Sequence, residues 1–132
     1  MKHLFLLVLT AISIPLFAAE SVYVCRKCRM LTVKDGIPSS SYCSAGSSHL
    51  WHRVGVPGKE IYRCRKCTLQ LLSNGMPSTS YCFMSGSHRW DKLGVRGNEH
   101  YTCRKCRMSL RTDGRPAGYG CSNNSMHLWH KL

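Results

Sequence analysis

Acidic residues are scarce in this chain of 132 residues, which has six Asp and Glu against 19 Lys and Arg. The excess of positive charge is spread along the sequence rather than collected in one tail. A balance of this kind favours a polyanion or an anionic surface as the partner. The same charge also suits a plain solubilising surface, and the composition alone leaves both readings open.

Apolar runs long enough for a comfortable membrane span, about 20 residues, are missing. The longest run, residues 4–17, follows Lys2 and His3 and precedes Ala18 and Ala19, which is the pattern of a signal peptide. We predict a signal peptide over residues 1–19 and a secreted or periplasmic mature chain without a stable membrane span. No cysteine lies at the cleavage region, so a lipid-anchored bacterial form is not indicated. An uncleaved N-terminal anchor is the alternative.

Beyond this leader, no stretch shows the apolar spacing of a long amphipathic helix. The chain instead repeats itself: Cys25-Arg26-Lys27-Cys28 returns at residues 64–67 and 103–106, a period of 39 residues. Alignment on this period gives three units, residues 22–54, 61–93 and 100–132, separated by six-residue joints at 55–60 and 94–99. A fixed period of this size indicates one structural unit copied three times.

The local pattern within a unit is that of short strands. Apolar and β-branched residues flank the first cysteine pair at 22–25 and 30–33, which predicts a tight hairpin. Asp35-Gly36 is a turn dipeptide with Pro38 two residues beyond the glycine, so a loop is expected up to Cys43. Residues 50–54 alternate and predict a third strand.

Every unit carries the same spacing of metal-ligand residues, Cys-x2-Cys-x14-Cys-x5-His, without insertion or deletion. Zinc binds four thiolate or imidazole ligands in a tetrahedron, and structural sites include Cys3His sets. We therefore predict three structural Zn2+ ions. Their ligands are Cys25, Cys28, Cys43 and His49; Cys64, Cys67, Cys82 and His88; and Cys103, Cys106, Cys121 and His127.

This ligand pattern resembles the zinc-ribbon and zinc-knuckle class of small modules. The resemblance covers most of the mature chain, and it implies a module that binds nucleic acid or protein. Units of 33 residues are also too small for a core of their own, so a metal would supply the missing stability. The predicted fold class is small, metal-stabilised and β-rich: three tandem zinc-ribbon-like units with little helix outside the signal peptide.

Disulfides are the rival use of the cysteines, because an exported chain meets an oxidising environment. The chain has nine cysteines and each unit has three, so pairing within a unit always leaves one thiol over. Thiol-disulfide exchange by the Cys-x2-Cys pairs is a further alternative, although a unit of this size has no room for the strand and helix of a thioredoxin-like motif. Hydrolytic zinc chemistry is disfavoured because four ligands close the site.

Basic residues stand at the tip of each cysteine turn, where they would offset thiolate charge or bind a polyanion. These residues are Arg26, Lys27, Arg65, Lys66, Arg104 and Lys105. Trp51, Trp90 and Trp129 are expected to cover the metal sites or pack on the tyrosines, with exposed stacking platforms as the alternative.

The predicted function is that of a non-enzymatic, basic binding module for an anionic polymer, an anionic surface or an acidic protein. Tandem copies would multiply weak contacts. The alternatives are a nucleic-acid-binding zinc protein and a thiol-disulfide redox protein.

Overall fold

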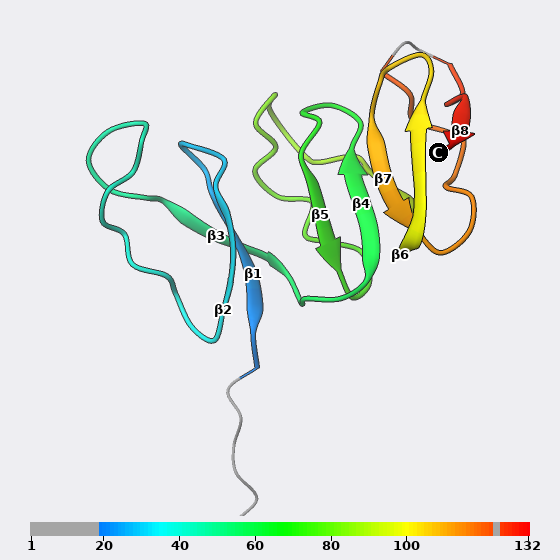
Figure 1. The fold of residues 1–132 in the computed structure, drawn as a ribbon. Helices are drawn as coiled ribbons and strands as arrows, with labels where there is room; N and C mark the ends of the chain where they lie inside the picture. The colour runs from blue at the N-terminus through cyan, green and yellow to red at the C-terminus, as the bar shows by residue number, and fades with distance from the viewer. Residues whose placement is uncertain (1–18, 123–124) are drawn as a thin grey trace, which may run out of the picture.

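The computed structural model describes residues 19–122 and 125–132, which form eight β-strands and no helix. The predicted signal peptide falls outside this range except for Ala19. Within the range, no helix is long and apolar enough to cross a membrane. The three units follow one another in a row, in the order of the chain (Figure 1).

Each unit is a small three-stranded antiparallel sheet. The first contains β1 (Ser21–Cys25), β2 (Leu31–Lys34) and β3 (Trp51–Gly55) in the order β2-β1-β3. The second contains β4 (Glu60–Cys64), β5 (Gln70–Ser73) and the first half of β6 (Trp90–Cys103). The second half of β6 pairs with β7 (Ser109–Thr112) and β8 (Trp129–Lys131). In every unit the strand that leads into the Cys-x2-Cys turn is therefore central.

The predicted hairpin and third strand are confirmed. Val22 pairs with Val33 and Val24 with Leu31 across the first hairpin, and the third strand runs over 51–55 against the expected 50–54. The segments between the turn dipeptides and the third cysteines contain no strand among the described residues. This agrees with the loop predicted there.

The two joints differ in conformation. Residues 56–59 leave the sheet, whereas 94–99 lie inside the continuous strand β6. The first joint contains Pro57, which has no N–H, and the equivalent Arg96 donates its N–H to Lys59 O at 2.7 Å. Arginine in place of proline at this position of the repeat thus lets the second joint continue the hydrogen-bonded strand β6.

The units are stacked, with cores that cross from one to the next. Val22, Val24 and Val54 of unit 1 pack with Tyr62 and Leu71 of unit 2. In the same way, Ile61 and Leu93 of unit 2 pack with Tyr101 and Leu110 of unit 3. Val54 and Leu93 are each only 1% exposed, so the end of each third strand is buried against the following unit. The molecule is therefore a short solenoid rather than three independent modules.

Backbone contacts repeat at both junctions. Val54 O and Val56 O accept the N–H groups of Ser78 and Asn74, at 2.7 and 2.8 Å. The equivalent bonds at the second junction join Leu93 O to Ala117 N and Val95 O to Asp113 N. A Cβ placed on Gly58 would lie 2.5 Å from Asn74 N, and one on Gly97 would collide with the backbone of Asp113. Glycine is needed in each joint because the next turn lies directly against it.

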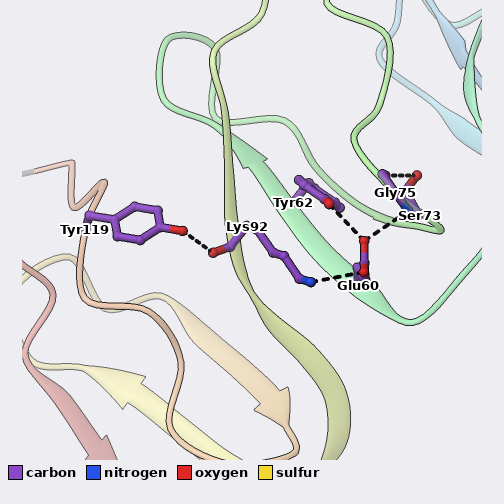
Figure 2. A network of polar contacts seen from close by, with 6 residues as sticks. All are labelled: Glu60, Tyr62, Ser73, Gly75, Lys92 and Tyr119. Carbon is purple, nitrogen blue, oxygen red and sulfur yellow. Dashed lines mark hydrogen bonds and ion pairs between the residues drawn. The ribbon is translucent and has the colours of Figure 1, made fainter.

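A carboxylate at the end of each joint fixes the start of the following unit. Glu60 accepts hydrogen bonds from Tyr62 Oη at 2.8 Å, Gly75 N at 3.0 Å and Lys92 Nζ at 3.0 Å (Figure 2). These donors, Lys92 first, hold the pKa of Glu60 below its ordinary value. Burial and the neighbouring carboxylate raise the pKa of Tyr62 to about 12.

The same arrangement recurs in unit 3, where Glu99 accepts from Tyr101 Oη at 2.9 Å and pairs with Lys131 at 3.4 Å. Figure 2 also shows Tyr119 donating to Lys92 O, at 2.8 Å, which ties a loop of unit 3 to β6. The recurrence of Tyr at 62 and 101 is thus explained by a partner on the joint.

Candidate metal centres

The structure brings the predicted ligands together as three separate sets of three Cys and one His. Within each set the ligand atoms all lie within 4.8 Å of one another. Each set draws on two places in its unit, the turn after the central strand and the loop before the third strand. Each set could hold one metal ion.

The distances within the sets fit a tetrahedral zinc site. Cys25 Sγ lies 3.9 Å from Cys43 Sγ, and Cys64 Sγ lies 3.9 Å from Cys82 Sγ. The imidazole Nδ1 atoms lie 3.4, 3.5 and 3.5 Å from the sulfurs of Cys28, Cys67 and Cys106. Bonds of about 2.3 Å to sulfur and about 2.0 Å to nitrogen place tetrahedral ligands about 3.8 Å (S to S) and about 3.5 Å (S to N) apart.

Backbone hydrogen bonds shape the Cys-x2-Cys turn. Cys25 N donates to Met30 O at 2.9 Å, Arg29 N donates to Cys25 O at 3.0 Å, and Lys27 N points at Cys25 Sγ at 3.4 Å. Arg29 has a φ of 65° to close the turn, as do Thr68 and Arg107 with 65° and 61°. The turn thereby directs both sulfurs to one point and aims N–H groups at the first of them.

The first cysteine of each pair ionises more readily than an ordinary thiol. Burial acts to raise the pKa of Cys25, but the N–H of Cys28 and the side chain of His49 oppose it and lower the pKa to about 5. The pKa of Cys103 is lowered in the same way, to about 6, and that of Cys64 is also lowered. In units 1 and 3 the first sulfur is therefore largely ionised and ready for a metal at neutral pH.

One further thiol in each set, Cys43, Cys67 or Cys106, resists ionisation without a cation. Burial raises the pKa of Cys67 to about 11, and burial likewise raises the pKa values of Cys43 and Cys106. A nearby divalent cation reverses this preference because it stabilises the thiolate directly. Each donor set thus combines one thiol whose pKa is lowered with one whose pKa is raised until a metal charge is present.

Each ligand histidine is held by its own loop and by a tryptophan. His49 N donates to Ser40 O at 2.6 Å, and the His49 and Trp51 rings stack with centroids 4.6 Å apart. His88 with Trp90 and His127 with Trp129 show the same 4.6 Å stacking. Trp51 Nε1 donates to Ser39 O at 2.9 Å. The predicted role of the tryptophans as covers of the sites is confirmed.

In units 2 and 3 the second nitrogen of the ligand histidine makes no contribution to this support. Nε2 of His88 and of His127 is buried without a hydrogen-bond partner among the described residues. Metal-bound imidazoles usually donate through that nitrogen to an oxygen acceptor. Here the ring is oriented by the stacked indole and by the backbone bond instead.

The lysines at the tips of the turns have a structural role that the sequence did not disclose. Lys27 Nζ donates to Gly46 O and Ser48 O, both at 2.9 Å, and Lys66 Nζ donates to Ser85 O at 2.6 Å. Lys105 Nζ reaches Ser125 Oγ at 2.9 Å. Each lysine ties the Cys-x2-Cys turn to the loop between the third cysteine and the histidine. The only signal in the sequence was the recurrence of lysine at this position.

The arginines of the tips lie in three different surroundings. Arg26 is stacked over Tyr81, Arg65 is paired with Asp91, and Arg104 contacts His130. The six basic residues predicted to bind a polyanion are therefore not equivalent. Lys27 and Lys66 donate to backbone carbonyl groups, and the three arginines differ in their partners.

Comparisons with family models, with curated proteins and with solved structures found no match. The nature of the sites therefore rests on the geometry of the chain itself.

The disulfide alternative has a different geometry. All nine cysteines are free, and the sulfur separation of 3.9 Å far exceeds the about 2.05 Å of a disulfide bond. No helix follows the Cys-x2-Cys turns in the described residues, so the setting of a thioredoxin-like motif is missing there. The arrangement is that of thiols converging with an imidazole on a common point.

Proposed function

We propose that the protein is a non-enzymatic repeat protein stabilised by three zinc ions, which presents a basic surface to an anionic polymer or surface outside the cytoplasm. The observation that carries the zinc assignment is the threefold convergence of three cysteines and one histidine at tetrahedral distances. Zinc is the metal that best matches a closed set of this composition.

A structural role for the metal follows from the closure of the sites. Catalytic zinc keeps one coordination position for water or substrate, and structural zinc takes four protein ligands. Each set here offers four, and Cys25, Cys64 and Cys103 have no exposed surface. We therefore assign no hydrolytic reaction to them.

The basic surface is supported by the way the few acids are used. Among the described residues, Glu60, Asp91 and Glu99 each form an ion pair with one Lys or Arg, and Lys and Arg outnumber Asp and Glu by 19 to 6 in the sequence. Exposed cations on all three units include Lys34, Lys59, Arg89, Arg96, Arg107, Arg111 and Arg115. Stacking fixes the spacing between units, so contacts made by one unit raise the effective concentration of the next.

Export is proposed from the apolar, charge-flanked segment at the N-terminus. It favours anionic polymers and surfaces met outside the cytoplasm over intracellular nucleic acid. An exported chain would also meet an oxidising environment, so the zinc content and the oxidation state of the cysteines should be measured together.

Binding of the purified, zinc-loaded chain to a sulfated polysaccharide and to vesicles containing anionic lipid tests the proposal by isothermal titration. We expect binding at low salt, and the logarithm of the association constant should fall as the logarithm of the salt concentration rises. The absence of binding to both probes at low salt would overturn the polyanion proposal. Tighter binding to nucleic acid than to either probe would favour the nucleic-acid alternative instead.

The redox alternative is tested by thiol titration with and without a chelator. The zinc proposal expects thiols that become reactive only after the metal is removed. A Cys25 to Cys28 disulfide that forms and is reduced while zinc remains bound elsewhere would support the redox alternative.

A further inference from the structure

Two hollows in the surface occupy equivalent positions at the two junctions. The first, of about 550 Å3, is lined by Arg26 of unit 1 and by Ser80, Tyr81, Phe83 and Gly86 of unit 2. The second, of about 430 Å3, places Arg65 of unit 2 against residues 119–122 of unit 3. In both, the arginine at the tip of one unit faces the third-cysteine loop of the next.

The first junction combines two arginines with two aromatic rings. Arg26 Cζ lies 3.8 Å from the centroid of the Tyr81 ring, and Arg29 Cζ lies 4.6 Å from that of Phe83. His52 lies edge-on against Tyr81, with centroids 4.8 Å apart. Among the described residues, neither arginine has a carboxylate within ion-pair distance. No carboxylate therefore neutralises the arginines of this junction.

The second junction has the same backbone plan without these features. Asp91 replaces His52 and holds Arg65 through two contacts, at 2.8 and 3.1 Å. Thr68, Gly120 and Ser122 stand where the first junction has Arg29, Tyr81 and Phe83. The Asp91 side chain is 13% exposed and that of Arg65 is 52% exposed, so the carboxylate is shielded while the guanidinium it neutralises lies at the surface. Stacking of units thus requires neither the arginine pair nor the aromatic rings.

A guanidinium stacked on a ring keeps its N–H donors in its own plane, where they suit a bidentate contact with an oxyanion. Stacking also restricts the arginine before the ligand arrives, which lowers the entropic cost of binding. We infer that the first junction, formed by Arg26, Arg29 and the Tyr81 loop, is a subsite for the sulfate or carboxylate groups of an acidic polysaccharide, and that Asp91 closes the equivalent position at the second junction.

The ring contacts favour a polysaccharide over single-stranded nucleic acid. Nucleic acid without base pairing binds through a series of free aromatic faces. One face each of Tyr81 and Phe83 is taken by arginine, and the second junction has Gly120 and Ser122 at the same positions. Tyr119, the ring at the second hollow, stands at a different position of the repeat and donates its hydroxyl to Lys92 O. Among the described residues the two junctions therefore present no repeated row of free aromatic faces, whereas the arginine charge of the first is available for anionic groups.

The test compares variants of equal net charge in titrations of the zinc-loaded full chain with a sulfated oligosaccharide. Arg26→Gln is expected to weaken binding by about tenfold or more, because it removes a charge-assisted bidentate contact. Lys34→Gln, an exposed lysine of the same unit, and Arg65→Gln, the equivalent residue at the second junction, are expected to weaken it less than threefold through charge alone. All variants must keep the zinc content of the unmodified chain.

A gain of binding completes the test. Asp91→Asn frees Arg65 and is expected to strengthen binding several-fold more than Asp35→Asn, which adds the same charge at an exposed turn. Equal effects of Arg26→Gln and Lys34→Gln would overturn the subsite. Tighter binding of single-stranded DNA of equal charge, lost in Arg26→Gln, would overturn the polysaccharide assignment.

The inference rests on the proposed function, but the two can fail separately. If the unmodified chain binds no anionic polymer, the proposed function fails. If it binds and Arg26→Gln behaves like Lys34→Gln, only the subsite is wrong.

Discussion

Cys25 Sγ lies 3.9 Å from Cys43 Sγ, although 18 residues of sequence separate them. The distance is too long for a disulfide and matches the edge of a tetrahedron around zinc. His49 and Cys28 close the same set with an Nδ1 to Sγ distance of 3.4 Å. The Cys-x2-Cys turn and the later loop are thus brought together at one candidate metal position rather than by a disulfide bond.

Cys43→Ser is expected to remove one zinc ion and to unfold most of unit 1. A structural zinc ion contributes on the order of 10 kcal/mol of apparent binding free energy, more than a unit of this size gains from packing. Native mass spectrometry should find two zinc ions in the variant. Ser44→Ala, at the adjacent exposed position, is the control and should keep three. Three ions in Cys43→Ser would contradict the ligand assignment.

Cys82→Ser, in the middle unit, should affect the whole stack more than Cys43→Ser. Unit 2 contributes Tyr62 and Leu71 to one shared core and Ile61 and Leu93 to the other. Hydrogen exchange should show lost protection in all three units for Cys82→Ser, and chiefly in units 1 and 2 for Cys43→Ser. Protection lost from unit 2 alone would show that the units fold independently.

Gly58→Ala should loosen the first junction. The new Cβ would meet the backbone of Asn74 at 2.5 Å, and overpacking of this kind costs about 1–3 kcal/mol. The free energy of unfolding of the zinc-loaded chain should fall by that amount, and the amide of Asn74, bonded to Val56 O, should exchange faster. Gly36→Ala is the control, because its new Cβ meets no atom within 4 Å. The positive φ of residue 36 should still lower the stability of this variant, but the exchange rate of the Asn74 amide should not rise.

Lys27→Met should speed the loss of zinc from unit 1 without changing the number of ions bound. The ammonium bridges the turn to Gly46 O and Ser48 O, so its removal frees the loop that carries Cys43 and His49. These contacts are exposed, and we expect transfer of zinc to a chelator to become about three to ten times faster. Lys34→Met serves as the matched control. An unchanged transfer rate would argue against the bracing role of Lys27.

Alkaline titration should find Tyr62 ionising near pH 12. Because its pKa is raised in the folded chain, the stabilisation is complete below the ordinary pKa of about 10 and is lost as the pH rises through the folded value. Glu60→Gln should lower the pKa of Tyr62 by removing the adjacent charge, as followed by NMR of ring-labelled tyrosine. A Tyr62 pKa that does not respond to Glu60→Gln would show that burial alone sets it.

The period of the sequence predicted the strands, the loops and the twelve Cys and His residues that converge in three sets, because each of these depends on local spacing. Cys-x2-Cys flanked by apolar residues requires a hairpin, and Gly36 requires a turn. The grouping of Cys43 and His49 with the first pair followed from the coordination needs of zinc.

The stacking of the units was not foreseen, since it depends on contacts between residues far apart in the repeat. Val54 and Leu93 looked like ordinary ends of third strands, yet both are buried by the following unit. The joints at 55–60 and 94–99 have similar sequences, yet only the second lies within a strand, because Pro57 lacks the N–H that Arg96 supplies. The different surroundings of Arg26 and Arg65 likewise arise only once the units are placed against one another.

Native mass spectrometry of the purified chain tests the central claim most directly, because it reports metal content and cysteine oxidation together. We predict the mass of the fully reduced chain with three zinc ions. A chelator should remove these ions, and the strand amides should then lose their protection from hydrogen exchange. A metal-free mass, or a mass lowered by two hydrogens for each disulfide in a folded chain, would contradict it.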